Sequence, residues 1–539
     1  MKTIPYILSV LMYVIIGMLT ACSSKTDEPA NFTEVGQAAS IYPDYKDIII
    51  PPNIAPLNFL VRTSGEKFVA VLTSSEGKKL SASASHGSTL QFNAEQWKSL
   101  LSVSRGKEIQ VQVYTYTEKK WLRFQPFTWH VAKEEIDPFV SYRLIEPGYS
   151  YYRQLGLYQR NLTNFQEEVI YENNRTFDYE DNHCINCHNY QNYSTQKMLF
   201  HVRTNHSGTI LTQGKDVEKI NFQHDSIPFG AVYPAWHPTQ NWILFSSNKT
   251  GQAFHILNEE KVEVIDMASD LLFYDANQKE VKYICHTDSL LETFPCWSPA
   301  GDKIYYCVGS LYDHQSTGTV RPKDFNTLRY NIVSRTFQSS DQSFGEEVTE
   351  INCDSIGISA SVPRISPDGR YLLFTAGYYG QFHIWHKSAD LYIKDLEADS
   401  VYPLQEANST DADSYHCWSS NGRWIVFSSR RDDGSYTRLY ITYFNPKGKA
   451  SKAFILPQQD PEHNMKRLKK LQCAGTDSRS GTDISSAVPT NYLSDERKSY
   501  YLQKRLIYDS KTILTTFDLD SRIFCRTGTR RINFTLFIR

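Results

Sequence analysis

The sequence has little net charge and no basic tract. Its 57 Lys and Arg residues nearly balance 59 Asp and Glu residues, which leaves a formal net charge of −2. A chain without a basic stripe or tail lacks the electrostatic footprint of a nucleic-acid-binding protein. We therefore expect no nucleic-acid partner.

Cysteine is scarce, and the signatures of an α/β-hydrolase and of a four-cysteine zinc site are both missing. Ten cysteines in 539 residues do not suggest a disulfide scaffold. There is no G-x-S-x-G elbow of an α/β-hydrolase, and only one C-x-x-C, so a four-cysteine zinc site is not expected. What the chain does have is 40% apolar and 13% aromatic residues, including 35 Tyr, which suits sizeable cores built from strands.

The first 42 residues read as a targeting segment and a tether. A short basic start precedes an apolar run over 4–18, and a small-residue stretch leads directly to Cys22. This resembles a bacterial lipoprotein signal over 1–21, cut before Cys22, whose thiol is then lipidated. The alternative is one uncleaved transmembrane helix, for which the run is short. Residues 22–42 would be a polar tether that holds the protein on a membrane outside the cytoplasm. The expected place is the outer membrane, on its periplasmic face or at the cell surface.

Residues 43–140 predict a small β-sandwich-like domain. Several short apolar runs are separated by turn residues, and the run at 109–114 alternates with a period of two. The stretch 94–101 is the one helix expected here. No catalytic constellation is recognisable in this domain.

The segment 141–194 is expected to be a linker that carries C-x-x-C-H, the attachment signature of a c-type haem. Cys184 and Cys187 would bond the porphyrin, and His188 would ligate the iron. Met198 and His201 are candidates for the sixth ligand, and His183 follows them. Three alternatives remain: a disulfide between the two cysteines, a scattered zinc site, or free thiols.

Four similar segments follow, at 233–247, 294–306, 362–374 and 415–429. The second reads F-P-C-W-S-P-A-G-D-K-I-Y-Y, in which an aromatic strand, a tight turn and an apolar strand make a hairpin. One such sheet cannot bury both of its faces, so several must stack radially. This pattern resembles the WD40-like repeat of TolB-type β-propellers, P-x-W-S-P-D-G-x-x-I-x-F. The resemblance implies a mostly β protein with a propeller of five to six blades over 195–467.

The lipoprotein start, the sandwich, the C-x-x-C-H and the propeller together resemble a family of bacterial TolB-like lipoproteins often labelled cytochrome c-related. The resemblance implies haem c as cofactor, a lipid anchor at Cys22, and a protein or peptide partner at a propeller face. The role expected is electron transfer or redox-linked assembly. The alternative is a non-redox binding or scaffold protein with a C-x-x-C disulfide, and a propeller hydrolase comes third.

Residues 468–539 differ in texture from the rest of the chain. Ser, Thr and Arg dominate there, and hydrophobic periodicity disappears. We interpret this tail as read out of frame with its ancestral sequence. It would then pack poorly, and the propeller would lack a closing element.

Overall fold

The computed structural model describes residues 28–145, 154–174, 183–204, 206–255, 259–310, 325–466, 470–477 and 500–501. The expected signal segment and Cys22 lie outside these residues. Within them, no helix has the length and apolar character needed to cross a membrane.

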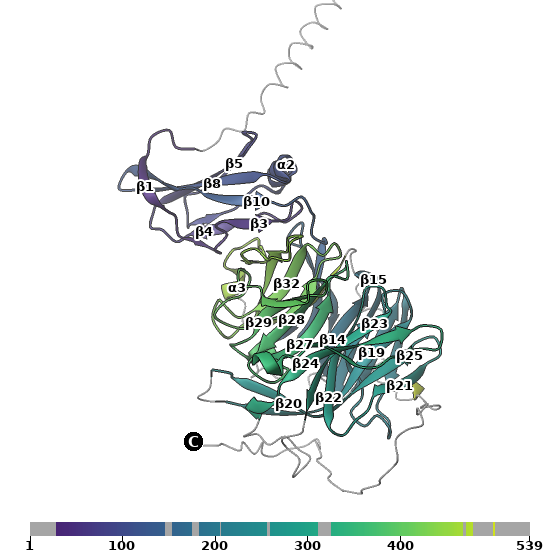
Figure 1. The fold of residues 1–539 in the computed structure, drawn as a ribbon. Helices are drawn as coiled ribbons and strands as arrows, with labels where there is room; N and C mark the ends of the chain where they lie inside the picture. Colours follow the sequence, from purple (N-terminus) through teal and green to yellow (C-terminus); the bar gives the residue numbers. More distant parts are fainter. Residues whose placement is uncertain are drawn as a thin grey trace, which may run out of the picture.

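The first domain is built from two sheets and one helix (Figure 1). In the larger sheet β8 pairs with β5, β9 and β10, and the smaller sheet has the order β2-β4-β7. The larger sheet contains β1 (Thr33–Ala38), β3 (Ile48–Ile50), β5 (Lys67–Ser74), β6 (Lys79–Ala84), β8 (Glu108–Thr117), β9 (Lys120–Gln125) and β10 (Phe127–Val131). The smaller contains β2 (Ile41–Tyr42), β4 (Phe59–Val61) and β7 (Thr89–Leu90).

Helix α2 (Ala94–Ser104) covers the apolar interior between the two sheets. Asn93 caps it by accepting hydrogen bonds from the backbone N–H groups of Glu95 and Gln96, both at 3.1 Å. Trp97 on its inner face is fully buried and lies 5.8 Å from Trp129 between ring centroids. Apolar side chains one helical turn apart therefore fix the helix on the sheet.

The sandwich-like domain begins earlier than expected. Strand β1 pairs with β9, and β2 pairs with β4, so residues from Thr33 onward belong to the domain. The expected tether over 22–42 is therefore wrong for its second half, because backbone pairing absorbs this polar stretch.

Six four-stranded sheets form the propeller. Their innermost strands contact one another in the order β14, β18, β22, β27, β31, β35, and β35 returns to β14. This closed circle buries both faces of every sheet and confirms the propeller. With the innermost strand first, blade 1 has β14 (His183–Gln191), β15 (Ser194–Thr204), β16 (Gly208–Gln213) and β17 (Asp216–Asn221), and blade 2 has β18 (Val232–Trp236), β19 (Trp242–Phe254), β20 (Val262–Asp275) and β21 (Glu280–Cys285). Blade 3 has β22 (Leu290–Trp297), β23 (Lys303–Ser310), β24 (Tyr330–Gln338) and β26 (Val348–Ile351), and blade 4 has β27 (Ser359–Ile365), β28 (Tyr371–Gly377), β29 (Asp390–Asp395) and β30 (Ser400–Pro403). Blade 5 has β31 (Asp413–Trp418), β32 (Trp424–Ser429), β33 (Arg438–Tyr443) and β34 (Phe454–Ile455), and blade 6 has β35 (Lys470–Asp477), β11 (Phe139–Ile145), β12 (Leu155–Asn161) and β13 (Glu167–Glu172).

Short elements complete the described chain. Strand β25 adds to blade 3, and β36 pairs in parallel with the outer strand of blade 1. These elements are β25 (Ser343–Phe344), η4 (Phe325–Thr327), η5 (Asp354–Ile356), η6 (His383–Trp385), α3 (His463–Lys466) and β36 (Tyr500–Tyr501).

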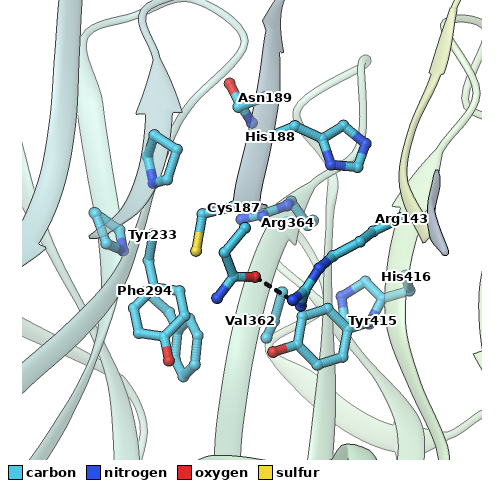
Figure 2. A pocket seen from close by; sticks show the side chains of 13 residues that line it. Arg143, Cys187, His188, Asn189, Tyr233, Phe294, Val362, Arg364, Tyr415 and His416 are labelled. Atoms are coloured by element: carbon cyan, nitrogen blue, oxygen red, sulfur yellow. Dashed lines mark hydrogen bonds between the residues drawn. The ribbon is translucent and has the colours of Figure 1, made fainter. Parts of the chain in front are cut away.

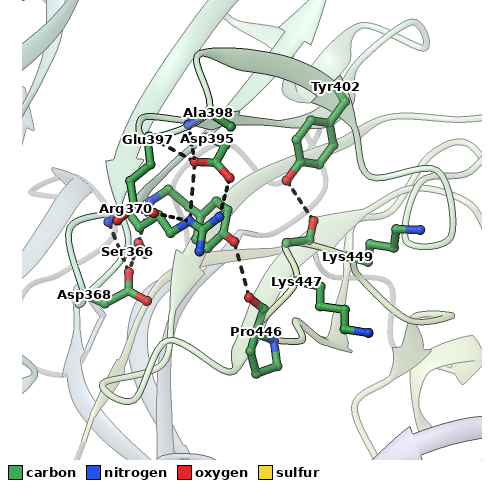
Figure 3. Close-up of polar contacts among 12 residues, drawn as sticks. Ser366, Asp368, Arg370, Asp395, Glu397, Ala398, Tyr402, Pro446, Lys447 and Lys449 are labelled. Atoms are coloured by element: carbon green, nitrogen blue, oxygen red, sulfur yellow. Dashed lines mark hydrogen bonds and ion pairs between the residues drawn. The ribbon is translucent and has the colours of Figure 1, made fainter.

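The repeated turn holds neighbouring blades together, as blade 4 shows (Figure 3). Arg370, just after the Pro-Asp-Gly turn, pairs with Asp395 at 2.9 Å, and Asp395 accepts from two backbone N–H groups of the next turn. Tyr402 then donates to the Gly448 carbonyl in blade 5 at 2.9 Å. The sequence motif therefore specifies the hairpin and its contact with the following blade.

Two expectations about the propeller's limits are wrong. The segment 141–194, expected to be a linker, contains most of β11 and all of β12, β13 and β14 in its described part. The tail from 468, expected to leave the propeller unclosed, supplies β35, which pairs with β11 along its length. Two segments that are far apart in sequence thus form blade 6 together. The other residues of this tail, apart from β36, lie outside the described residues.

The sandwich-like domain packs against blade 5, with one continuous apolar core between them. Asp137 accepts hydrogen bonds from Ser420 and from Thr476 of β35. Glu134 accepts from Tyr443 at 3.1 Å. The domain interface therefore also supports the closing strand.

Candidate functional site

The C-x-x-C-H lies on a β-strand, at a bulge that the propeller repeats. In five innermost strands the register with the next strand shifts by one residue, and the bulged residue has a left-handed backbone conformation. Such bulges re-aim side chains at functional sites. The residues are Cys187 (φ 50°), Tyr233 (49°), Phe294 (52°), Val362 (52°) and Tyr415 (46°).

The C-x-x-C-H motif therefore occupies the same structural position in blade 1 as the propeller repeat does in the following blades. Cys187 occupies the position of Tyr233 and Phe294 in the following blades, and His188 occupies the position of Pro234 and Pro295. Because bulge positions from successive blades converge on the propeller axis, the thiol and the imidazole face the central channel.

These bulges enclose a cavity of about 70 Å³ at the centre of the propeller, which we call the throat. Figure 2 shows Arg143 reaching into it from β11, with the imidazoles of His188 and His416 on either side. Of the residues that the structure describes, none with a carboxylate lines the throat. The lining residues are Arg143, Asn186, Cys187, His188, Asn189, Tyr233, Pro234, Phe294, Pro295, Val362, Arg364, Tyr415 and His416.

The two histidines of the throat are neutral. His188 is 7% exposed and His416 is 4% exposed. Burial lowers the pKa of each to about 3, and the nearby charges of Arg143 and Arg364 act in the same direction. His416 Nδ1 lies 3.2 Å from the Thr375 hydroxyl. Nε2 of each ring has no hydrogen-bond partner among the described residues.

The two arginines of the throat differ in what they contact. Arg143 donates to the Asn186 side-chain oxygen at 3.2 Å and to the Cys184 sulfur at 3.3 Å. Arg364 donates to the Pro363 carbonyl at 3.0 Å. Within the described part of the chain, no Asp or Glu forms an ion pair with Arg364. Its charge is therefore not neutralised by a carboxylate.

A larger cavity of about 660 Å³ opens from the throat on one face of the propeller, and we call it the funnel. Arg143, Asn186 and Tyr233 line both cavities, so the two are continuous. The inner strands β14, β15 and β19 and the connections between blades form the funnel walls, whose residues include Cys184, His201, Arg203, Phe229, Asn248, Gly251, Phe382, Trp385 and Arg430.

One wall of the funnel is a hairpin that reaches from blade 2 to blade 4. Glu263 on β20 accepts hydrogen bonds from Tyr379 at 2.8 Å and from His386 at 2.9 Å. Glu260 accepts from the backbone N–H groups of Lys387 and Ser388. Burial raises the pKa of Glu263, but His386, Tyr379 and His255 together outweigh burial and lower the pKa overall. An ionised carboxylate therefore fastens this wall.

The predicted haem residues do not converge on one cavity. Cys187 and His188 line the throat, whereas Cys184 lines the funnel. Met198 is buried in the apolar core of blade 1, and His201 faces the funnel with its pKa lowered to about 3 by burial. His183 is fully buried beside Tyr171, away from both cavities.

A porphyrin bonded to both thiols does not fit this arrangement. Arg143 and Asn186, hydrogen-bonded to each other, lie at the boundary between the cavities that contain the two cysteines. The throat holds only a handful of water molecules. Haem attachment stays a prediction.

The alternatives for the two cysteines can be located as well. Both are thiols in the structure, and Cys184 is buried. Burial raises the pKa of Cys187. The described residues contain no group of three or more His, Cys, Asp or Glu side chains placed to hold a metal ion.

Sequence reasoning missed Arg143, Arg364 and His416 as site residues. Aligning the repeats at their bulges could have found His416, because it takes the place of proline in blade 5. The same alignment places Arg364 where other blades have Ala235 or Cys296. No sequence signal marks Arg143, because it reaches the throat only when blade 6 closes.

Comparisons with known proteins bear on the fold alone. No protein-family model matches the chain, and no curated protein matches its sequence. Hydrazine synthase of Kuenenia stuttgartiensis overlays at a TM-score of 0.38 with 11% identity, covering 64% of this chain and about half (48%) of that one. The propeller domain of the Trilobed protease from Pyrococcus furiosus gives a TM-score of 0.30 and 12% identity, covering 62% and 79%. The tricorn protease gives a TM-score of 0.27 and 10% identity, covering 72% and 35%.

Proposed function

We propose that this chain is a binding protein, exported and anchored to a membrane through Cys22, whose propeller takes a peptide or small organic ligand into the funnel. The observation that carries the proposal is the funnel itself. Its volume of about 660 Å³ lies within the roughly 300–1,000 Å³ typical of ligand pockets. The throat adds a polar end to this cavity.

The chemistry of the walls supports a ligand with mixed character. Phe229, Phe382 and Trp385 offer apolar and aromatic surface, while Asn248 and Arg430 offer polar contacts. Pockets of this kind combine apolar area with a few polar groups that fix orientation. Arg430 lies 4.4 Å from the centre of the Trp385 ring, so part of the wall is already held in place.

The fastened hairpin supports the same proposal. Its contacts with blade 4 involve buried groups, namely Glu263 and His386, which are 3% and 1% exposed in their side chains. A wall fixed before binding lowers the ordering cost that a ligand must overcome. The funnel is thus suited to bind without rearrangement of this hairpin.

The test fills the funnel with a side chain. Gly251 lines the funnel, and an added Cβ would meet only Met267, at 3.8 Å. Gly251→Trp should therefore fold yet reduce binding at least about tenfold. The matched control is Gly36→Trp, at an exposed strand position in the other domain where a Cβ meets nothing within 4 Å.

Binding would be measured by native mass spectrometry with a mixture of tetrapeptides as the probe. The proposal expects complexes with the unsubstituted protein and the Gly36 variant, and few with the Gly251 variant. Equal complex formation by all three proteins would place binding outside the funnel and overturn the proposal. A mixture that yields no complexes with the unsubstituted protein would also count against it.

A second candidate function is electron transfer through a covalent haem. The observation that favours it is the buried Nε2 of His188, which lacks a partner beside the thiol of Cys187. An absorption spectrum and the intact mass of protein from a host able to attach haem would decide. A Soret band that Cys187→Ser removes would support haem, and an unmodified mass would dismiss it.

A further inference from the structure

We propose that the throat binds a carboxylate group, so that the ligand of the funnel is an organic acid or a peptide that enters with its free carboxyl end first. This inference deepens the proposed function and rests on it. It follows from four side chains, Arg143, His188, Arg364 and His416, which meet at the propeller axis from four different blades.

The throat is an electropositive cavity, and the residues that the structure describes supply no counterion in its lining. Arg143 and Arg364 line it, and none of the lining residues is acidic. A cleft lined by charge of one sign concentrates field and attracts the opposite charge. An anion is therefore the ligand that the cavity favours.

Backbone groups of Ser141, Val362 and Leu373 lie near the two histidine rings, yet one nitrogen of each ring has no hydrogen-bond partner among the described residues. Nε2 of His188 and Nε2 of His416 are buried without a partner, and both rings line the throat. Buried polar groups are otherwise almost always hydrogen-bonded, so two unsatisfied ones in one cavity point to a missing ligand. Since both rings are neutral, each can donate one N–H to an anion without adding charge.

The arginines favour one carboxylate over a larger or more highly charged anion. Arg143 already donates to Asn186 and Cys184, which leaves Arg364 as the guanidinium without a strong acceptor. A single guanidinium fork matches the two oxygens of one carboxylate. Apolar walls from Phe294 and Val362 make a dianion costlier to desolvate.

The position of the throat explains how the funnel ligand would be oriented. Tyr233 and Asn186 line both cavities, so a carboxyl group in the throat leaves the rest of the ligand in the funnel. The small volume of the throat, about 70 Å³, admits the terminal group and excludes the remainder. The ligand therefore has its charge at one end.

The test uses propionate and its uncharged analogue propionamide as probes on the full chain, followed by saturation-transfer NMR. Propionate should bind saturably and propionamide should not. Arg364→Gln should weaken propionate binding at least about tenfold, because it removes a charge-assisted contact. Arg370→Gln is the matched control, since Arg370 lies six residues away on the same blade and pairs with Asp395. It should leave propionate binding unchanged.

Arg364→Lys guards against misfolding because it keeps the charge while losing the fork, and it should bind propionate more weakly than the unsubstituted protein. Equal binding of propionate and propionamide, or an unaffected Arg364→Gln, would overturn the inference. Stronger binding of inorganic phosphate than of propionate would overturn the carboxylate assignment. Tetrapeptides that bind in the funnel as well when amidated as when free would refute the inference and leave the proposed function standing.

Discussion

Asp266 should contribute a loss of folding stability as pH rises, and Asp266→Asn should remove that contribution. Asp266 lies on β20 and is fully buried. Its Oδ2 accepts a hydrogen bond from Tyr330 at 3.3 Å, and its Oδ1 has no partner in the described structure. Burial raises its pKa from 3.8 to about 7, against smaller opposing effects of Asn248 and Tyr330.

The magnitude follows from the two pKa values. Between pH 3.8 and about 7 the folded protein holds a proton that the unfolded chain releases. The contribution of Asp266 to folding stability is therefore fully present below pH 3.8 and declines until the folded carboxyl ionises near pH 7. At about 1.4 kcal/mol per pH unit, the loss at pH 8 is on the order of 4 kcal/mol.

Asparagine keeps the shape of the side chain and cannot ionise. Asp266→Asn should leave stability almost unchanged at pH 4 and raise it by up to about 4 kcal/mol at pH 8. Tyr330 does not complicate this range, because burial raises its pKa well above 10. The measurement is urea unfolding followed by tryptophan fluorescence at both pH values.

Asp216→Asn is the control, since Asp216 is exposed at the start of β17. It should change stability little at either pH. The reasoning fails if Asp266→Asn and the unsubstituted protein differ by the same amount at pH 4 and pH 8. A uniform difference would mean that the substitution alters packing rather than a titration.

Three other substitutions or truncations test the fold. Gly301→Ala should cost more than about 2 kcal/mol of folding stability, because Gly301 has φ +74° and a Cβ there collides with the His237 ring. Gly369→Ala is the control and should cost only about 1 kcal/mol, because Gly369 has φ +80° but open space around it. Thermal unfolding of the two variants gives the comparison. A chain that ends after residue 466 should melt at a temperature on the order of 10 °C lower than a chain that ends after residue 477. Only the longer chain keeps β35 and the hydrogen bonds of Thr476. Equal melting temperatures would contradict the closing role of β35. His386→Phe removes the closer of the two imidazoles beside the buried carboxylate of Glu263, the other being His255 at 3.3 Å, and should cost about 3 kcal/mol. Hydrogen exchange should become faster at 250–255 and 262–266 and stay unchanged in blade 5.

The blades that carry the full turn motif could be predicted from sequence, and the others could not. In blades 3 to 5 an Ala-Gly, Asp-Gly or Asn-Gly turn between two apolar strands predicts the hairpin directly. In blade 1 the turn falls on Asn192 and Tyr193, which both adopt positive φ without glycine. Strands β11 to β13 have no copy of the motif, and β35, which pairs with β11, lies some 330 residues away in sequence.

The candidate site was only half visible for the same reason. His188 stands out in sequence because cysteines surround it, but Arg143 joins it only through the closure of blade 6 onto blade 1. Arg364 looks like an ordinary strand residue until the bulge turns its neighbours toward the axis. Sites formed by several blades depend on long-range closure, which local patterns do not encode.

The C-x-x-C-H shows how backbone context changes what a motif means. In a regular strand, residues three apart point to opposite faces, so two thiols at that spacing do not approach one ligand from the same side. Here the bulge at Cys187 turns one thiol into the throat, while Cys184 remains beside Arg143 at the funnel. For both to bond one porphyrin, β14 would have to leave its pairing with β15 and its place beside β18. A haem-bearing form of this protein would therefore have a blade 1 rebuilt around the cofactor, and its amides over 183–191 would lose the exchange protection that a central strand provides.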